Sequence, residues 1–298
     1  MSLHVVMAGG SGFLGSHLTE HLEERGHRVT RLVRRPPHGS HESAWDPGSG
    51  TLDHALVASA DIVVNLAGSP TAGNPHSKRW ARELRESRVG TTRVLAEAVA
   101  AAPSPPAYLA GNGISFYGDH GDEPLTEEAE SRGDALLTSV TREWQEATRP
   151  AVDAGARVCV LRTSPVQDRR SPPLKQLLLA TRLGLGTVLG SGRQHMPMIS
   201  LRDWLAAVTF LAETPGVAGP VNLCCPETPT NAEYTRAIAD AAHRKALLKV
   251  PAAVLAPAAG ALAPELLGSV NAVPQVLLEA GFEFADRDVD AVIAAALD

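Results

Sequence analysis

A glycine-rich segment near the N-terminus has the spacing of a phosphate-binding loop. Gly9, Gly12 and Gly15 form a G-x-x-G-x-x-G pattern that follows a short apolar run and opens a helical pattern. Gly9 would permit the tight turn, Gly12 the approach of backbone to a pyrophosphate, and Gly15 close packing of helix on strand. The helix N-terminus then faces the phosphates. With Phe13 and Leu14, the segment predicts a dinucleotide site, although a lone glycine motif also occurs in ordinary loops.

The end of the next strand-like segment predicts which dinucleotide binds. An NAD site usually has an acidic residue about 20 residues past the glycines, where it holds the ribose 2′-hydroxyl. Residues 28–35 contain no acid; Val33 occupies that place, and Arg34 and Arg35 follow it. Because a guanidinium binds a phosphate at two points, this end favours the 2′-phosphate of NADP(H). The alternative is that both arginines are simply solvated.

The elements that would position these residues alternate between strand and helix. We expect strands at 3–7, 28–33, 61–66, 107–110 and 156–161, and helices at 14–25, 79–102 and 135–152. Leu66, Ala67 and Gly68 close the third strand, where they would let the backbone pass close to the adenosine. This alternation predicts an α/β fold, a doubly wound parallel sheet of the Rossmann type.

The second half of the chain is less regular. Proline and glycine become frequent after about residue 165, and only short helices are expected, at 203–213, 231–242 and 274–280. We therefore expect an NADP-binding Rossmann domain over 1–165. A smaller, irregular C-terminal substrate portion follows over 166–298, interleaved with the sheet rather than separate.

The composition excludes several classes of protein. The chain has 298 residues, a net charge of −6 and 44% hydrophobic residues, which is typical of a soluble globular protein without a nucleic-acid surface. Three cysteines without a C-x-x-C exclude a disulfide framework and a cysteine zinc site. The small-apolar stretch 250–264 is broken by prolines and too short to span a membrane. We expect a cytoplasmic protein that binds a small molecule. The composition does not decide between a monomer and a homo-oligomer.

Two short patterns are set aside. His17 and His21 lie four residues apart on the first helix, but no third ligand is evident, so we expect no metal site. Cys224 and Cys225 are adjacent at the end of a strand-like run, where we expect apolar packing rather than redox chemistry.

Motifs spread over nearly the whole chain resemble the extended short-chain dehydrogenase/reductase superfamily, also called the NAD-dependent epimerase/dehydratase superfamily. Beyond the glycine loop, the matching stretches are 45–47, 65–68, 86–88, 116–119, 184–194, 220–222 and 277–284. They are similar to an atypical epimerase-like branch described as nucleoside-diphosphate-sugar epimerases. The segments 190–194 and 279–284 are specific, whereas the glycine loop alone is not. The resemblance implies hydride transfer at a nicotinamide.

The resemblance also implies a catalytic pair that this sequence lacks. The superfamily uses a tyrosine four residues before a lysine, whose charge lowers the pKa of the phenol that exchanges a proton with substrate. The three tyrosines are followed at that distance by Asn112, Gly121 and Ile238. On the helix where the pair is expected stand Leu137 and Thr141. Asn112 and Arg88 stand where the superfamily usually has a hydroxyl and an asparagine.

Other residues are candidates for the missing proton donor. His195 comes first because imidazole titrates near neutral pH, although a structural histidine in a glycine-rich loop is the alternative. Ser115 and Tyr117 follow the fourth strand, where this fold forms its nicotinamide pocket. Tyr117 would need a nearby cation, for which we consider Arg88 and Arg193.

Four residues are candidates for binding the substrate. They are Arg88, Asn112, Arg193 and Gln194. For each arginine, a clamp on an anionic substrate and a structural ion pair are both open.

Together these features predict an NADP(H)-dependent oxidoreductase or epimerase-like enzyme that acts on an unknown small molecule without the usual Tyr/Lys pair. The alternative is a non-catalytic NADP(H)-binding redox sensor or scaffold. A nicotinamide pocket lined by Arg88, Asn112, Arg193 and His195 would favour the enzyme. A pocket plugged by Leu136 or Leu137 would favour the binding protein.

Overall fold

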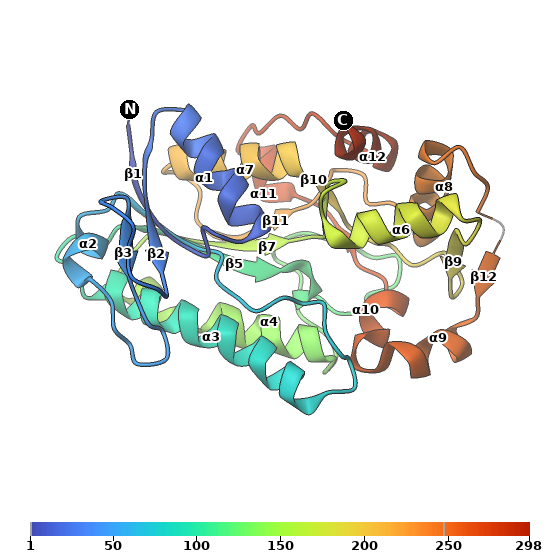
Figure 1. Cartoon of the computed structure of the whole chain (residues 1–298), viewed down its shortest axis with the longest axis horizontal. Helices are drawn as coiled ribbons and strands as arrows, with labels where there is room; N and C mark the ends of the chain where they lie inside the picture. The colour runs from blue at the N-terminus through green and yellow to red at the C-terminus, as the bar shows by residue number, and fades with distance from the viewer. Residues whose placement is uncertain (1, 247) are drawn as a thin grey trace. The chain divides into compact units, whose positions relative to one another are not determined.

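The computed structural model describes residues 2–246 and 248–298 (Figure 1). Its main feature is a seven-stranded sheet with the strand order β11-β7-β5-β4-β1-β2-β3. The strands are β1 (His4–Ala8), β2 (Arg28–Val33), β3 (Glu42–Ala44), β4 (Ile62–Asn65), β5 (Ala107–Gly113), β7 (Val158–Thr163) and β11 (Gly219–Leu223). β1 pairs in parallel with β2 on one side and with β4 on the other. The chain order reverses there, and ligands of doubly wound sheets bind at such a switch point.

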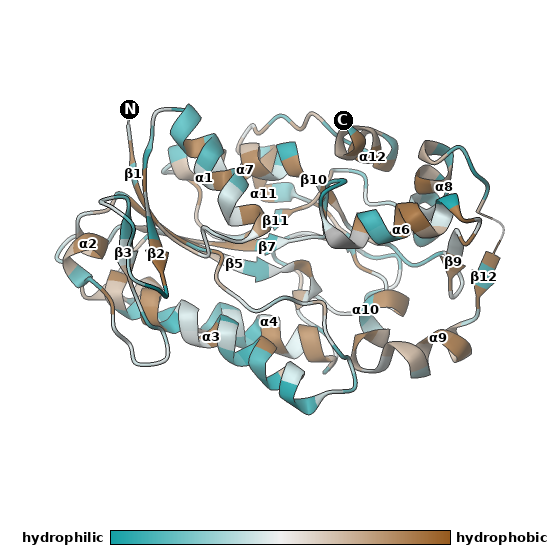
Figure 2. Cartoon of the chain, in the orientation of Figure 1, coloured by the Kyte–Doolittle hydropathy of each residue, from teal (hydrophilic) through white to brown (hydrophobic). Residues whose placement is uncertain are grey.

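Burial explains why the central strands read as apolar runs. Every residue of β1 and β4 is buried, as expected for parallel strands covered on both faces. Figure 2 shows β1 as mostly hydrophobic, whereas hydrophilic residues follow much of α3 (Lys78–Ala100). One core cluster joins the sheet to its helices through residues such as Val6, Val63 and Val99.

Helices pack on this sheet. They include α1 (Phe13–Glu24), α2 (His54–Ala58), α4 (Leu136–Glu146), α5 (Arg149–Asp153) and α7 (Leu201–Glu213). α1 and α3 lie on opposite faces of the sheet (Figure 1). α1 buries Leu18 and Leu22 and ends before Gly26, which has a φ of 85°. A left-handed residue after the last turn is a common helix stop, and glycine adopts it without strain.

The remaining elements are short. Three two-stranded parallel sheets pair β8 (Val166–Gln167) with β10 (Ile199–Ser200), β9 (Thr187–Leu189) with β12 (Leu248–Val250), and β6 (Pro124–Leu125) with β13 (Asn271–Ala272). The helices are α6 (Pro172–Arg182), α8 (Asn231–Ala241), α9 (Ala252–Ala259), α10 (Ala263–Leu267), α11 (Gln275–Glu279) and α12 (Val289–Leu297), with 3-10 turns η1 (Ile114–Phe116) and η2 (Gly260–Leu262). A second core cluster lies among α6, α8 and α12, around Leu178, Ile238 and Val292.

The chain forms two compact units, each built from several segments. One comprises residues 1–112, 140–161 and 208–220, and the other residues 113–139, 162–207 and 221–298. The division along the sequence at residue 165 stays a prediction. Within the part of the chain that the structure describes, no helix has the length and apolar character needed to cross a bilayer.

The expected doubly wound α/β fold is confirmed, with two corrections among the helices. The second half also forms α6, α9, α10 and α12, which were not expected. The other correction concerns a helix of the first half. A single helix over 135–152 was expected, but α4 ends at Glu146 and α5 begins at Arg149. Pro150 lies in the first turn of α5. Proline has no N–H and restricts the residue before it, so it starts a helix readily and does not continue one.

Candidate dinucleotide-binding and proton-transfer site

The glycine loop joins β1 to α1 with very little free space. A Cβ at Gly9, whose φ is 81°, would lie 2.5 Å from the Leu66 carbonyl carbon, and one at Gly15 would lie 2.2 Å from the Gly9 oxygen. Gly12 differs, because a Cβ there meets only the Gly9 oxygen, at 3.4 Å. Gly12 is also the N-cap of α1 and offers no side-chain cap, so the helix N-terminus is available to an anion.

The loop borders a cavity of about 780 Å³, which lies within the first unit. This volume falls within the range typical of small-molecule sites. Of the residues that we predicted to bind cofactor, those in the lining are Gly9, Gly12, Arg34, Arg35, Leu66, Ala67 and Gly68. The other lining residues include Glu42, Trp45, Ser69, Ser87 and Thr91.

Three predicted cofactor residues are placed differently. Phe13, Leu14 and Gly15 do not line the cavity. The ring of Phe13 packs on His17, with 4.8 Å between ring centroids. Gly15 lies against the backbone of Gly9, where its role is close packing of the helix on the loop. We therefore expect the backbone N–H groups in the first turn of α1, rather than the side chains of Phe13 and Leu14, to contact a cofactor.

The turn after β4 is fixed by a buried amide. Asn65 is fully buried, and its Nδ2 donates to Thr92 Oγ1 at 2.8 Å. Its Oδ1 accepts from the N–H of Ala67 at 3.0 Å. These two bonds hold the Leu66–Gly68 backbone at the cavity lining, as the sequence predicts.

Arg35 is already engaged by a carboxylate that the sequence analysis missed. Its Nη1 and Nη2 donate to Oε2 and Oε1 of Glu42, both at 2.8 Å, and Arg31 Nη2 donates to Oε1 at 2.9 Å. Glu42 comes from β3, and its side chain is 2% exposed. Hydrogen bonds from Arg35 and then from the N–H of His38 lower the pKa of Glu42 to about 2. The fork of Arg35 is therefore occupied by Glu42 in this structure, and its binding of a phosphate stays a prediction.

Arg34, also at this end of β2, differs from Arg35 in its contacts. It is exposed and lines the cavity, and among the described residues its side chain takes part in no hydrogen bond or ion pair. The pKa of Asp46 is lowered by hydrogen bonds from Gly48 and Ser49, and the charge of Arg34 adds to this effect. Arg34 is thus the residue of this group that can meet an incoming phosphate.

Arg88 carries a half-buried charge without an acidic partner among the described residues. Its Nη1 donates to the Leu84 carbonyl and its Nη2 to Thr71 Oγ1, both at 3.1 Å. The guanidinium also stacks on Trp144, 5.3 Å from the ring centroid. Burial lowers the pKa of Arg88 to about 10. The alternative of a structural ion pair is excluded for the described residues, and Arg88 lies against Gly68 of the cavity lining.

Asn112 closes β5 and is buried. Its Nδ2 donates to the carbonyl of Thr141 at 3.1 Å. Thr141 holds one of the two places at which the superfamily's pair was sought. The side chain of Asn112 thus ties β5 to α4, and its role in binding substrate stays a prediction.

Tyr117 lies in the core of the second unit rather than on a surface. Its side chain is fully buried, its hydroxyl donates to Asn222 Oδ1 at 2.7 Å, and Arg162 Nη1 donates to the hydroxyl at 2.9 Å. Arg162, and not Arg88 or Arg193, is therefore the cation beside this phenol. Burial raises the pKa of Tyr117 to about 12, although the charge of Arg162 opposes the shift. This geometry is that of a structural tyrosine.

Ser115 is the half-buried middle residue of η1, directly after β5. Burial raises the pKa of the Glu265 carboxyl, from α10, and a hydrogen bond from the Ser115 hydroxyl partly opposes this shift. Ser115 thus lies beside a titratable group, the carboxyl of Glu265.

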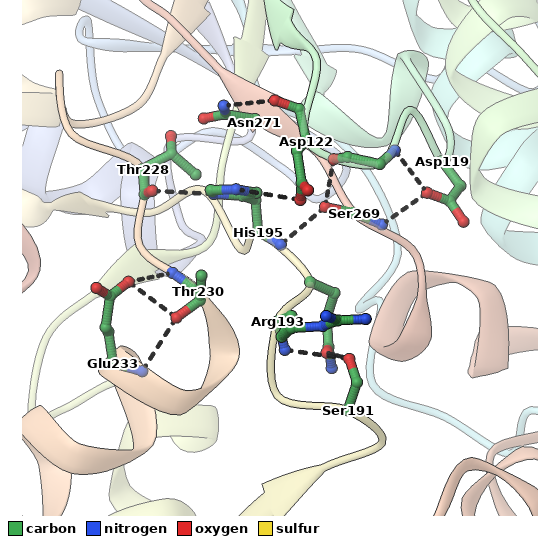
Figure 3. Close-up of polar contacts among 12 residues, drawn as sticks. Asp119, Asp122, Ser191, Arg193, His195, Thr228, Thr230, Glu233, Ser269 and Asn271 are labelled. Carbon is green, nitrogen blue, oxygen red and sulfur yellow. Dashed lines mark hydrogen bonds and ion pairs between the residues drawn. The ribbon is translucent and has the colours of Figure 1, made fainter.

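His195 is held between two acceptors (Figure 3). Its Nδ1 lies 3.3 Å from the carbonyl oxygen of Thr228, and its Nε2 lies 3.6 Å from Asp122 Oδ1. The backbone N–H of His195 donates to Ser269 Oγ at 2.9 Å. Both ring nitrogens thus face groups of the same unit. The arrangement matches the structural alternative, and a catalytic role for His195 stays a prediction.

The two residues before His195, Arg193 and Gln194, differ in the exposure of their side chains. Gln194 is buried, and its Nε2 donates to the carbonyls of Leu189 and Leu266 at 3.0 and 3.2 Å. It therefore fixes the loop rather than presenting its amide to a ligand. The side chain of Arg193 is exposed, and its backbone N–H donates to Ser191 Oγ.

The two patterns set aside earlier have the following contacts in the structure. His17 Nδ1 bonds to the Phe13 carbonyl at 2.7 Å. Among the described residues, no group of three or more His, Cys, Asp or Glu residues is arranged to hold a metal. Cys224 and Cys225 are fully buried, and burial raises the pKa of both thiols.

Comparison with known proteins connects this geometry to a family. Residues 5–224 match the NAD dependent epimerase/dehydratase family, and residues 250–296 match a domain of unknown function, DUF1731. The chain belongs to the NAD dependent epimerase/dehydratase family. The resemblance inferred from the sequence motifs is therefore confirmed, and the chain is an NAD(P)-binding Rossmann-fold member of this family.

Relatives within the epimerase family cover nearly the whole chain. Epimerase family protein Mb2239 of Mycobacterium bovis is 39% identical over 281 residues, which are 94% of this chain and 93% of that protein. The human epimerase family protein SDR39U1 is 32% identical over 297 residues, 98% of each chain. The crystal structure of human SDR39U1 (isoform 2) with NADPH has a TM-score of 0.86 at 31% identity and covers 99% of both chains.

Two site residues had no signal that sequence reasoning could use. Glu42 sits on a three-residue edge strand without an apolar alternation, so neither the strand nor its partners were visible. Arg162 lies inside β7, and its contact with Tyr117 spans 45 positions of the chain. Trp45 belongs to a motif that carried the resemblance, but its place in the cavity lining follows from the fold alone.

Proposed function

We propose that this protein is an NADP(H)-dependent oxidoreductase or epimerase-like enzyme that acts on a small molecule without a Tyr/Lys pair. The observation that carries the proposal is the basic end of β2. Arg34 lines the dinucleotide cavity uncommitted, and the acid of this region, Glu42, is occupied by Arg31 and Arg35. A ribose 2′-hydroxyl would find Glu42 already bound by two arginines, whereas a 2′-phosphate would find the guanidinium of Arg34.

The cavity fits the rest of a dinucleotide. Gly12 and the uncapped N-terminus of α1 are suited to the pyrophosphate, and the Leu66–Gly68 backbone borders the space for the adenosine. The family match and the solved NADPH complex of human SDR39U1 support the same assignment. When bound, the nicotinamide would accept or donate a hydride.

Arg88 supports a ligand with an anionic group. The guanidinium of Arg88 is half-buried and has lost part of its hydration without gaining a carboxylate partner, so an anion would complete its interactions. Its neighbours Leu84, Thr71 and Trp144 orient the guanidinium without neutralising it. We therefore assign Arg88 to the binding of an anionic part of the substrate or cofactor. Asn112, Arg193 and Gln194 remain weaker candidates on the contacts described above.

The rival function is a non-catalytic NADP(H)-binding protein. It is favoured by the occupied hydroxyl of Tyr117 and by the two acceptors that face the ring nitrogens of His195. Both functions share the cofactor, so the cofactor is tested first.

The test is a fluorescence titration of wild type and Arg34→Asp with NADPH and NADH. We expect wild type to prefer NADPH and Arg34→Asp to abolish or reverse this preference, because an acid there repels the phosphate and can hold a ribose hydroxyl. His195→Ala serves as the control, since His195 does not line the cavity and its ring faces Thr228 and Asp122, so its loss should leave NADPH affinity unchanged. An unchanged preference in Arg34→Asp would refute the assignment of this site.

A further inference from the structure

Exposed apolar side chains gather in two segments of the second unit. Seven large apolar side chains are exposed among the described residues, and six of them lie within 177–185 or 248–254. They are Leu177, Leu179, Leu183, Leu185, Leu248 and Val254. The chain continues from the second segment into α9, where no residue is fully buried. Scattered apolar residues are ordinary on a protein surface, but a group of them marks an interaction surface.

Backbone contacts bring the two segments side by side. β9 and β12 pair in parallel, with Leu248 opposite Thr187 (Figure 1). The N–H of Leu248 donates to the carbonyl of Gly186 at 3.4 Å, and Arg244 Nε donates to the carbonyl of Arg182 at 3.2 Å. Both segments belong to the second unit. The exposed leucines around these contacts therefore form one patch.

The charged residues of this patch all have the same sign. Residues 174–190 and 243–264 contain no Asp or Glu, although the whole chain has a net charge of −6. Figure 2 shows hydrophilic and hydrophobic residues next to each other on α6 and β12. None of the exposed cations forms an ion pair among the residues that the structure describes. With the six apolar residues, the basic-apolar patch comprises Lys175, Arg182, Arg244, Lys245 and Lys249.

A small cavity adjoins the patch. Its volume is about 300 Å³, and Arg236, Arg244 and Lys245 line it together with Asp240 and several apolar side chains. The nearby acids face Arg236, which lies 4.0 Å from Asp240 Oδ2 and 3.8 Å from Asp290 Oδ2. Arg244 and Lys245 form no such pair among the described residues. The cavity therefore has room and free positive charge for a group of the size of a phosphate.

The combination of aliphatic and basic side chains narrows the choice of partner. A symmetric dimer through this patch would bring like charges of two copies together, which is unfavourable. Proteins that bind single-stranded nucleic acids stack bases on aromatic rings, and residues 174–190 and 243–264 contain no Phe, Tyr or Trp. The surface of an anionic bilayer takes both kinds of group, because apolar side chains enter the acyl boundary while cations meet the headgroups.

We propose that the basic-apolar patch binds the surface of bilayers that contain anionic phospholipids. The exposed leucines insert at the level of the headgroups, and Arg244 and Lys245 contact a headgroup phosphate. The rest of the chain is acidic, but salt screens its repulsion beyond about 8–10 Å. This inference is independent of the proposed function.

The basic part of the patch is tested by cosedimentation of the full chain with vesicles. We expect binding to phosphatidylglycerol mixed with phosphatidylcholine, no binding to phosphatidylcholine alone, and release when salt rises from about 0.1 M to about 1 M. Lys245→Gln/Lys249→Gln should weaken binding by about 25-fold, on the order of fivefold for each charge. Lys78→Gln/Arg93→Gln is the matched control. It removes the same charge from exposed positions of the other unit, so binding should change by about twofold at most.

The apolar part is tested by Leu183→Asp. Leu183 is 70% exposed, so the replacement should leave folding intact, and thermal melts of each variant check this. We expect vesicle binding to fall by at least about tenfold, because a charge replaces an inserted side chain. Val152→Asp is the matched control, since Val152 is the seventh exposed apolar residue and lies outside the patch. It should bind vesicles as wild type does.

Several outcomes would overturn the proposal. Equal binding to both kinds of vesicle, or to neither, would exclude an anionic bilayer as the partner. Equal losses in the two double variants, or in the two aspartate variants, would exclude this patch. A dimer in sedimentation equilibrium that Leu183→Asp dissociates would assign the patch to a second copy of the chain. Binding to single-stranded DNA as tight as binding to the mixed vesicles would assign it to a nucleic acid.

Discussion

Arg35 and Glu42 form a two-point ion pair, with both N–O distances at 2.8 Å. The pair joins the end of β2 to β3. It occupies both Nη atoms of Arg35, which the sequence analysis had assigned to a phosphate. Two neighbouring arginines, Arg34 and Arg35, therefore have different roles: one faces the cavity uncommitted, and the other fixes the edge of the sheet.

This difference predicts different outcomes for the two alanine variants. Arg34→Ala should weaken NADPH binding by about 10- to 100-fold, the value of one or two charge-assisted hydrogen bonds, and leave the free energy of unfolding unchanged. Arg35→Ala should lower the free energy of unfolding because Glu42 loses its main donor. Nucleotide titrations and urea denaturation of both variants check this. Equal losses of NADPH affinity with no loss of stability in Arg35→Ala would contradict it.

Glu42 also predicts a pH dependence of stability. Its pKa in the folded protein is about 2, below the ordinary value of 4.5. A depressed carboxyl pKa stabilises the folded state at pH values above 4.5, and this contribution is lost as the pH falls from about 4.5 toward 2. Denaturation of wild type and Glu42→Gln at several pH values should show a steeper loss in wild type within this window. Parallel curves would count against an ionised, arginine-bound Glu42.

The glycines of the loop predict a separation of folding from binding. Gly12→Ala should fold with a stability change of about 1 kcal/mol or less, since the added Cβ meets only one atom, at 3.4 Å, yet it should weaken NADPH binding. Gly15→Ala should lose about 1–3 kcal/mol or more, because its Cβ would lie 2.2 Å from the Gly9 oxygen. Thermal melts and NADPH titrations of both variants measure this. Full NADPH affinity in Gly12→Ala would show that the pyrophosphate lies elsewhere.

Removing one oxygen tests the structural interpretation of Tyr117. Tyr117→Phe should cost about 1–3 kcal/mol of stability, because Arg162 loses an acceptor and Asn222 Oδ1 loses a donor in the core. NADPH affinity should not change. A variant of wild-type stability that has lost turnover would instead return Tyr117 to the list of proton donors.

For Arg88 we predict that removing the charge does not lower the free energy of unfolding, unlike the loss expected for Tyr117→Phe. Arg88→Met keeps much of the side-chain volume and removes a half-buried cation, so the free energy of unfolding should stay constant or rise by on the order of 1 kcal/mol. Arg88→Lys is the matched control that retains the charge. A loss of roughly 3 kcal/mol or more in Arg88→Met would instead show that the hydrogen bonds of Arg88 to Leu84 and Thr71 hold the fold together.

The N-terminal half of the fold follows from local pattern, and the structure shows why. The expected bounds of β2 are those observed, and the α1 and β4 bounds differ by one residue at each end. These elements are buried or amphipathic along their whole length, so periodicity locates them. The break between α4 and α5 needed only the recognition of Pro150 as a helix start.

The site itself was only partly predictable, because its key contacts join distant segments. The glycines within residues 9–15 and the arginines at 34–35 predict a dinucleotide-binding site through their spacing alone. In contrast, Arg162 reaches Tyr117 across 45 positions, and Ser115 lies 150 positions before Glu265. The burial of Arg162 and of Glu265 Oε1 is a property of the fold, which a single sequence does not reveal.

The central claim is that the basic end of β2 selects NADP(H). Titration of the wild-type protein with NADPH and with NADH, at one fixed ionic strength, tests it most directly. We predict that NADPH binds at least about tenfold more tightly, as one charge-assisted contact to the 2′-phosphate requires. The same dissociation constant for both nucleotides, or a lower one for NADH, would contradict the account.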